Sequence, residues 1–175
     1  SAGTTSANGG NSDPGLPNAA ELSACLLSWW QAHGRRDPLQ KPWMFKPAGG
    51  WPEADHPLDP YGIWIAEVML QQTQLAVALP YWERWMATFP TLEALAAASL
   101  DQVRLQWQGL GYYSRARRLH EAAQLLVNSP WPHALEGWMA LPGIGRTTAG
   151  SILSSAFNAP LPILDGNVKR VLARL

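Results

Sequence analysis

Apolar residues recur at helical spacing through most of this chain, and glycine and proline interrupt them at short intervals. The first such stretch covers 21–33 and stops at Gly34, a residue type that often follows the last turn of a helix. No segment shows the alternation of apolar and polar residues typical of a half-buried strand. The chain has 175 residues, 47% of them hydrophobic, which suffices for one domain with a core. The sequence therefore predicts an all-α fold with short connections.

Turn and capping residues divide the chain further. Residues 1–20 are small, polar and turn-forming, so we expect a disordered N-terminal segment. The proline-rich segment 35–60 predicts a long ordered loop rather than regular structure. Beyond it, helices are expected over 61–82 (two helices, divided near Pro80), 91–98, 99–107 (opened by a capping box at Ser99), 113–127, 133–140, 146–157 and 166–175.

The formal net charge of zero conceals an asymmetry between the two parts of the chain. Residues 1–100 carry 5 basic and 9 acidic side chains (5 − 9 = −4), whereas residues 101–175 carry 8 basic and 4 acidic ones (8 − 4 = +4). Seven of those eight are arginines, which suit a face turned toward phosphate. An ordinary solvated surface would have the same composition, so charge alone leaves both readings open. No apolar run approaches the length of a membrane span.

Cys25 is the single cysteine of the chain. One thiol excludes an internal disulfide and any all-cysteine metal or iron–sulfur site within these residues, so no metal ligands are expected here. Because Cys25 lies beside the apolar stripe of the helix at 21–33, we expect its thiol to be buried and inert.

Two carboxylates stand in unlike surroundings. Glu67 is the only acidic or basic residue between Tyr61 and Trp82, and burial on such an apolar wall would raise its pKa and let it act as a general acid. An exposed position on the same helix would give it no such role. Asp165 stands at a helix start, where it is either an N-cap or an anion held ionised by amide donors, or both. One neutral acid and one anion are what cleavage of a glycosidic bond requires.

Three turns carry groups suited to nucleic acid. The run from Gln71 to Gln74 offers uncharged hydrogen-bonding side chains to base edges, although a solvated polar face explains it nearly as well. The hairpin 142–145 and the looser 109–113 turn place glycines where backbone amides can meet a phosphate, and Tyr112 and Tyr113 could wedge between bases. Each hairpin alone also fits a helix C-cap followed by a turn.

Four blocks in this order resemble a known family: WIAEVMLQQTQ (64–74), GLGYYSRARRLH (109–120), LPGIGRTTAG (141–150) and PILDGNVKRVLAR (162–174). They are similar to the helix-hairpin-helix–Gly/Pro–Asp superfamily of DNA glycosylases and, within it, to the adenine DNA glycosylases of the MutY type. The resemblance runs from about residue 21 to the last residue. It implies a monofunctional enzyme of base excision repair that hydrolyses the N-glycosidic bond of adenine opposite 8-oxoguanine or guanine.

The resemblance also implies roles for the residues near the reaction. Glu67 matches the general acid that protonates adenine, Asp165 the carboxylate that stabilises the cationic sugar, and Asn167 its polar helper. Thr147 occupies the position that is lysine in relatives that form an imine, so base removal by water is expected. Lys169 is the nearest substitute amine and should give weak strand cleavage at most.

Further positions are matched to DNA and to the extruded base. The residues expected to contact DNA lie on the glutamine run, on the two hairpins and at the helix starts that follow them: Gln71, Gln72, Gly109, Gly111, Tyr112, Tyr113, Arg115, Pro142, Gly143, Gly145 and Arg146. Trp43 and Leu70 are expected to line the adenine pocket. Two departures from the family bear on that pocket, namely a longer loop at 35–60 and Met44 in place of the usual arginine.

The resemblance implies that 21–175 is a partial catalytic domain. Its six-helix module should contain the helix-hairpin-helix at about 138–157 and stop short of the [4Fe–4S] cluster and the C-terminal recognition region of the complete protein. We therefore expect low stability, exposed apolar surface and little activity from this piece alone. The expected partner is duplex DNA with an adenine mismatch, bound by a cytoplasmic monomer without membrane contact. The alternatives are an endonuclease III-like or G:T mismatch glycosylase and a non-catalytic helix-hairpin-helix DNA-binding module.

Overall fold

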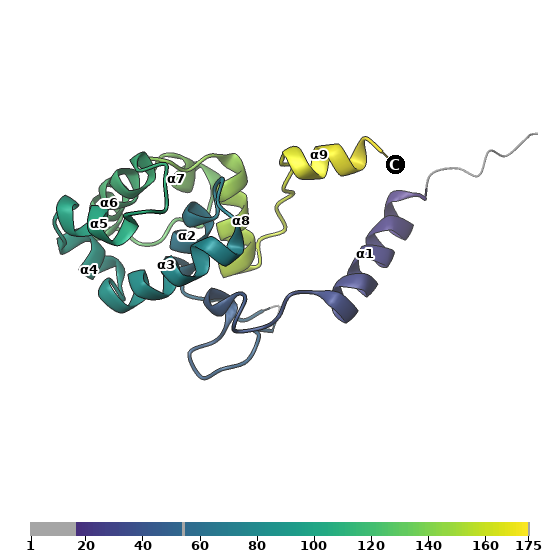
Figure 1. The fold of residues 1–175 in the computed structure, drawn as a ribbon. Coiled ribbons are helices and arrows are strands. Elements are labelled where there is room, and N and C mark those ends of the chain that lie inside the picture. The colour runs from purple at the N-terminus through teal and green to yellow at the C-terminus, as the bar shows by residue number, and fades with distance from the viewer. Residues whose placement is uncertain (1–16, 54, 175) are drawn as a thin grey trace, which may run out of the picture.

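Short helices joined by tight turns make up the part of the chain that the structure describes, and their ends follow the capping residues of the sequence (Figure 1). The structure is a computed structural model that describes residues 17–53 and 55–174. Within these ranges the helices are α1 (Ala19–His33), η1 (a 3₁₀ turn, Pro42–Met44), α2 (Pro60–Met69), α3 (Leu75–Thr88), α4 (Leu92–Ala97), α5 (Leu100–Trp107), α6 (Ser114–Leu126), α7 (Leu135–Met139), α8 (Arg146–Phe157) and α9 (Gly166–Leu172). They contain no strand, and the all-α prediction is confirmed.

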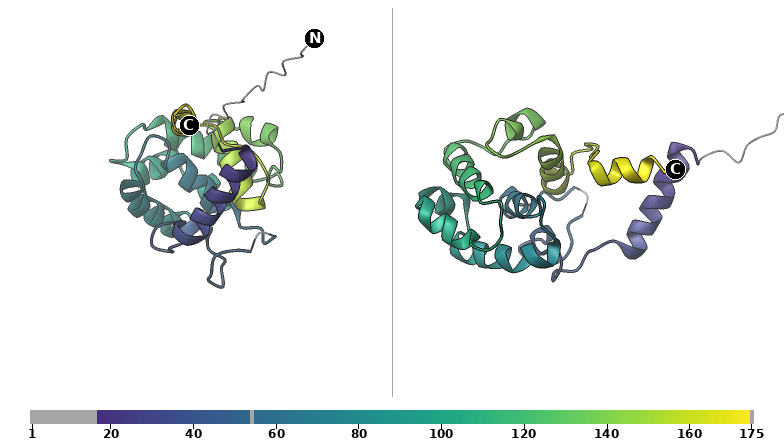
Figure 2. Two further views of the ribbon diagram at one scale, coloured as in Figure 1. Left: turned by 90° about the vertical axis from the view of Figure 1, so that its right-hand side faces the viewer. Right: turned by 45° about the horizontal axis from the view of Figure 1, so that its top comes forward.

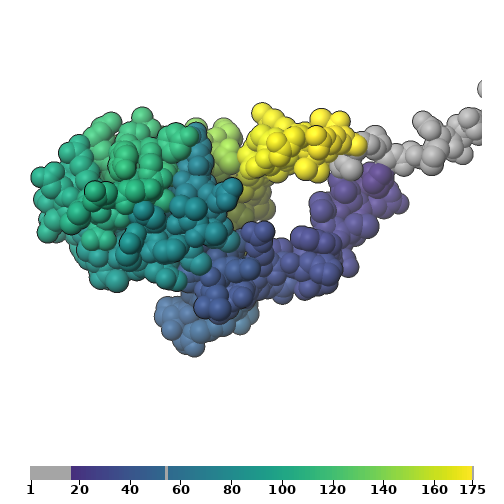
Figure 3. All heavy atoms as spheres, viewed as in Figure 1, coloured from purple at the N-terminus to yellow at the C-terminus, as the bar shows by residue number. Residues whose placement is uncertain are grey.

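The two terminal helices stand apart from the others. In Figure 1 and in the right-hand view of Figure 2, α2 to α8 form one bundle, while α1 and α9 extend from the same side of it. The space-filling view shows open space between α9 and α1 (Figure 3). Neither helix buries a residue, and both expose large apolar side chains, among them Leu26, Leu27, Val171 and Leu172. Leu26 and Trp29 of the apolar stripe predicted for 21–33 therefore face solvent, whereas Leu22 and Trp30 are half-buried.

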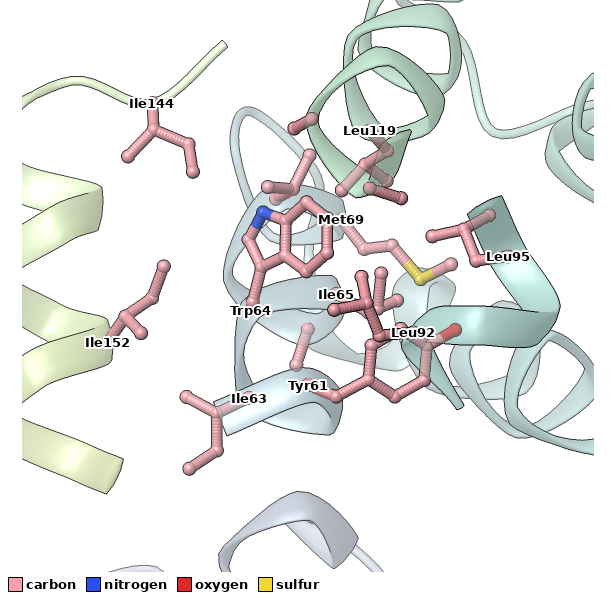
Figure 4. Close-up of a cluster of buried hydrophobic side chains, with 14 of the residues drawn as sticks. Tyr61, Ile63, Trp64, Ile65, Met69, Leu92, Leu95, Leu119, Ile144 and Ile152 are labelled. Atoms are coloured by element: carbon pink, nitrogen blue, oxygen red, sulfur yellow. The ribbon is translucent and has the colours of Figure 1, made fainter. Parts of the chain in front are cut away.

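Helix α2 forms the centre of the bundle (Figure 4). Eight of its residues are buried: Pro60, Tyr61, Ile63, Trp64, Ile65, Ala66, Val68 and Met69. Trp64 lies between Leu119 of α6 and Ile144 and Ile152 on the other side. Each large apolar side chain buried in this way stabilises the fold by about 1.5–3 kcal/mol. The helix that carries Glu67 is therefore held on nearly all sides.

Helix α8 packs along α2, and its small residues permit close approach. Its buried positions are Ala149, Gly150, Ile152, Leu153 and Ala156. The segment that follows α8 turns back on it, since a Cβ added at Gly150 would lie 3.8 Å from Cγ1 of Ile163. This arrangement brings the half-buried residues Ser151 and Ser155 of α8 to the side of α2 that bears Glu67.

Two boundary predictions are wrong. The segment 61–82 divides at residues 70–74 rather than near Pro80, which lies inside α3. Gln72 adopts a left-handed backbone (φ 57°), which ends the helical hydrogen-bond pattern, whereas a proline removes a single donor. At the other end of the chain, Asn18 forms a capping box with Glu21, so residues 19 and 20 are helical. Residues 1–16 of the predicted disordered segment lie outside the described residues.

The expected burial of Cys25 is also wrong, because its thiol is exposed. The thiol belongs to α1, none of whose residues is buried against the rest of the described chain. No helix of the described residues has both the length and the hydropathy needed to cross a membrane.

Candidate active site

Glu67 lies near the end of α2 and faces a cavity of about 230 Å³. The cavity is lined by residues from α1, the loop around η1, α2 and α8: Trp30, Lys41, Trp43, Met44, Trp51, Glu67, Leu70, Ser151 and Ser155. Three tryptophans supply flat apolar walls, and the carboxyl group, the lysine and the two serine hydroxyls supply the polar groups. A largely apolar cavity with a few convergent polar groups is the usual form of a small-molecule site.

Burial raises the pKa of the Glu67 carboxyl above its ordinary value, since desolvation disfavours the charged form. The nearby Ser151 hydroxyl and the positive charge of Lys41 act in the opposite direction and offset part of the effect. The direction of the net shift is the one expected from the sequence. A carboxyl group that holds its proton at higher pH can donate it to a leaving group.

The two residues expected to line the base pocket are part of this cavity. Trp43 belongs to η1, is 8% exposed and packs edge-to-face on Trp82 with ring centroids 5.6 Å apart. Leu70 is the C-cap of α2, three residues after Glu67. The fold thus brings together Glu67, Trp43 and Leu70 from separate parts of the sequence.

Asp165 does not line the Glu67 cavity. It is the N-cap of α9, where its Oδ1 accepts a 2.8 Å hydrogen bond from the amide of Val168. The capping role expected from the sequence is therefore present. Among the described residues no hydrogen bond joins Asp165 to Glu67, and Asp165 is absent from the cavity lining, so the two carboxylates do not share one cavity in this structure.

The other residues assigned to the reaction are at the surface. Asn167 lies in the first turn of α9, and its side-chain oxygen accepts a 2.8 Å hydrogen bond from Arg170. Thr147 is exposed in the first turn of α8. Lys169, the substitute amine, is exposed on α9. None of the three lines the cavity.

The glutamine run forms the turn between α2 and α3. The side-chain amide of Gln71 donates to Thr148 Oγ1 at 3.0 Å and to the Gly143 carbonyl at 3.4 Å. This turn therefore touches the hairpin before α8. Gln72 is exposed, and its left-handed backbone presents the side chain to solvent.

The Gly109–Tyr113 turn presents two tyrosines outward. Gly109, Gly111 and Tyr112 have positive φ angles of 94°, 83° and 47°. Tyr112 and Tyr113 are 63% and 55% exposed, which is high for aromatic side chains. The Tyr113 hydroxyl accepts a 3.3 Å hydrogen bond from the Gly109 amide, and the Arg115 guanidinium lies 5.5 Å from the centre of the Tyr112 ring. The indole of the buried Trp107 donates to the Gly111 carbonyl at 2.9 Å and thereby holds the turn against the core.

The second hairpin, Leu141–Gly145, leads directly into α8. Gly143 has a φ of 78° and lies against Arg118, whose Cβ and Cδ would be 3.1 Å from an added Cβ. Gly145 is the N-cap of α8 and forms no side-chain cap, so the first amides of this helix point outward uncapped. Pro142 is half-buried, and Arg146 is exposed beside these amides.

The structure corrects the assignment of Arg115 to DNA. Its side chain is 6% exposed, and its guanidinium donates to the carbonyls of Val68, Met69, Gln71 and Gly111 and to the Thr73 hydroxyl. A guanidinium used in this way has no free face for a phosphate. The arginine periodicity of this helix could have indicated Arg118 instead, which is exposed three residues later and touches the hairpin.

Sequence reasoning also missed the polar lining of the cavity. Lys41, Ser151 and Ser155 were not singled out, although all three line it with Glu67. Ser151 and Ser155 follow Thr147 at helical spacing on α8, which is a signal that the sequence contains. Lys41 lies two residues before Trp43 in an irregular loop, where periodicity gives no guidance.

Comparisons with known proteins agree with this architecture. Residues 65–175 match the family described as HhH-GPD superfamily base excision DNA repair protein. The adenine DNA glycosylase of Homo sapiens is 43% identical over 165 residues, 90% of this chain and 29% of that protein. The protein of the same name from Buchnera aphidicola (subsp. Acyrthosiphon pisum) is 39% identical over 156 residues, 87% of this chain and 41% of that protein. The chain thus spans well under half of the length of these relatives.

Solved structures share the fold at lower identity. A thermostable thymine-DNA glycosylase superposes with a TM-score of 0.71 at 21% identity, covering 86% of this chain and 64% of that one. Endonuclease III in a non-covalent DNA complex superposes with a TM-score of 0.65 at 22% identity, covering 89% of this chain and 68% of that one. At this identity the likeness establishes the helix-hairpin-helix glycosylase fold.

Proposed function

Because the chain belongs to the HhH-GPD superfamily of base excision DNA repair proteins, we propose that it carries the catalytic residues of a monofunctional adenine DNA glycosylase. Its substrate is duplex DNA with adenine opposite 8-oxoguanine or guanine. The observation that carries the proposal is the half-buried Glu67 carboxyl, whose pKa is raised by burial, in a cavity walled by tryptophans. The 37–44% identity to proteins named adenine DNA glycosylase supports the choice of base.

In the proposed reaction Glu67 gives its proton to the extruded adenine. The bond between C1′ and N9 breaks, and its electron pair leaves with the base. The sugar becomes an oxocarbenium-like cation, which the Asp165 carboxylate stabilises. Water then adds to C1′ and gives up a proton to the Glu67 carboxylate, which restores the acid. This step requires α9 to bring Asp165 to the nucleotide held by Glu67 in the complex with DNA. Thr147 offers no amine, so no imine forms at that position.

The proposed DNA contacts come from three neighbouring turns. The uncapped first amides of α8, with exposed Arg146 beside them, suit a phosphate. Tyr112, Tyr113 and Gln72 are exposed on the other two turns, where they can enter the duplex around the mismatch. Arg118 joins this set in place of Arg115.

The residues of this chain do not fit an iron–sulfur cluster. A [4Fe–4S] cluster takes four thiolate ligands, and the chain has the single Cys25. No step of the reaction above uses a metal, and we propose that the cluster of the complete protein is held by residues other than these. A monomer in the compartment that holds the DNA is likewise part of the proposal.

The test is base release by the full-length protein from a panel of duplexes. The expected result is abasic sites opposite 8-oxoguanine and guanine where adenine was present, and their loss in Glu67→Gln. Release of an oxidised pyrimidine, or of thymine opposite guanine, would favour the other glycosylase classes instead. DNA binding without release of any base would favour a non-catalytic helix-hairpin-helix module.

A further inference from the structure

Lys41 occupies a fixed position at the edge of the Glu67 cavity. Its amide donates to the Asp37 carbonyl at 2.9 Å, and its own carbonyl accepts from the Met44 amide at 3.0 Å. These two bonds hold the backbone at the start of η1, directly before the turn that carries Trp43. The half-buried side chain lines the same cavity as Glu67 and adds its positive charge to the surroundings of that carboxyl.

The ammonium of Lys41 has no hydrogen-bond or ion-pair partner among the residues that the structure describes. Within residues 17–53 and 55–174, no hydrogen bond or ion pair shorter than 4.0 Å joins its Nζ to another side chain. Lys46, five residues later, is different, since its Nζ pairs with Glu53 at 3.0 Å. Lys41 is also the only cationic residue among those that line the cavity. A half-buried cation left without a partner is suited to an acceptor on a bound ligand.

The cavity therefore presents two donors of different kinds. Glu67, when protonated, donates one hydrogen bond, and the ammonium of Lys41 donates up to three and accepts none. The serine hydroxyls of Ser151 and Ser155 can do either. Adenine offers acceptor nitrogens on both of its rings and an exocyclic amino donor. The two donors match the acceptor nitrogens of adenine, and the serine hydroxyls can accept from its amino group. The flat tryptophan side chains match the faces of its rings.

We propose that Lys41 is a base-recognition residue. Its ammonium donates a hydrogen bond to a nitrogen in the six-membered ring of the extruded adenine. The proposal rests on the proposed function and adds a residue to its substrate contacts. Met44, which lines the same cavity, carries no charge, so Lys41 is the one basic side chain among the residues that line it.

The test compares Lys41→Met and Lys41→Arg with wild-type full-length protein, and uses Lys46→Met as the matched control from the same loop. Single-turnover release of adenine opposite 8-oxoguanine is measured first. Affinity is then measured for two duplexes, one with a non-hydrolysable 2′-fluoro adenine nucleotide and one with a tetrahydrofuran abasic site. Lys41→Met should slow release about tenfold or more and weaken binding of the adenine duplex. It should leave binding of the abasic duplex unchanged, while Lys41→Arg recovers most of the loss and Lys46→Met behaves as wild type.

Modified bases identify the acceptor. If Lys41 donates to a nitrogen of the six-membered ring, 1-deaza- or 3-deazaadenine is released more slowly by wild type, and Lys41→Met adds no further loss on that base. Unchanged release of adenine by Lys41→Met overturns the proposal. Equally weakened binding of both duplexes also overturns it, because that result indicates a contact with a phosphate rather than with the base. If wild type releases no adenine, the proposed function fails. The binding measurements then still decide the role of Lys41. If wild type binds the adenine duplex more tightly than the abasic one and Lys41→Met loses that preference, the role is supported, and otherwise it is overturned.

Discussion

The side-chain amide of Gln71 donates a 3.0 Å hydrogen bond to the hydroxyl of Thr148, 77 residues later in the chain. The bond connects the turn after α2 to the first part of α8. The same amide lies 3.4 Å from the Gly143 carbonyl of the hairpin. Two of the three turns proposed to meet DNA are thus joined directly before any DNA is bound.

The first prediction concerns that bond. Gln71→Leu and Thr148→Val should each lower the free energy of unfolding, and the double variant should lose less than the sum. The expected coupling is about 1 kcal/mol, the usual net value of one such hydrogen bond. A double-mutant cycle by urea denaturation measures it. Additive losses would show that the two side chains do not interact in solution.

The second prediction concerns Arg115. Arg115→Met removes the guanidinium that donates to the carbonyls of Val68, Met69 and Gln71 inside the fold, so stability should fall by at least about 2 kcal/mol. Arg117→Met is the matched control from the same helix, since Arg117 forms only an exposed ion pair with Glu121. It should cost about 0.5 kcal/mol or less. Equal effects in chemical denaturation would contradict the buried role of Arg115.

The third prediction separates the two roles of Asp165. Asp165→Asn keeps an N-cap side chain and removes the charge, whereas Asp165→Ala removes both. Thermal denaturation should show a loss of about 1 kcal/mol for alanine and much less for asparagine. Base release by the full-length protein should fall about 100-fold or more in both variants. An active Asp165→Asn enzyme would mean that the carboxylate is only a helix cap.

The fourth prediction follows from the raised pKa of Glu67. The folded state binds the Glu67 proton more tightly than the unfolded chain, so this residue contributes stability below the unfolded pKa. That contribution is lost as the pH rises through the folded pKa. Glu67→Gln, which cannot ionise, should therefore gain stability relative to wild type as the pH increases across this range. Parallel unfolding curves of the two proteins from pH 4 to 8 measure it, and a constant difference would show that burial does not shift the pKa.

Much of the fold was predictable because local chemistry determines it. The Ser99 capping box opens α5 as expected, and α8 begins at Arg146 and ends at Phe157 as predicted. These ends depend on a few neighbouring residues, which a sequence displays directly. Glu67, Trp43 and Leu70, which the family resemblance places near the base, line one cavity, although their roles there stay predictions.

Other features depend on contacts between distant segments. Arg115 looks like any other arginine of a basic helix, and only the position of α2 reveals that carbonyls surround it. Cys25 lies beside a correct apolar stripe, yet nothing in the described chain covers it. Lys41 belongs to an irregular loop whose course no periodicity predicts, so its place beside Glu67 required the three-dimensional arrangement.

The central claim is that burial of the Glu67 carboxyl away from water raises its pKa, so that it can act as an acid. The direct measurement is a carbon-13 NMR titration of the Glu67 side-chain carboxyl in the folded full-length protein, with Glu67→Gln used to assign the signal. We expect a midpoint above 4.5, the ordinary value for glutamate, and single-turnover release of adenine that declines through the same midpoint as the pH rises. A midpoint at or below the ordinary value, or undiminished base release by Glu67→Gln, would contradict the account.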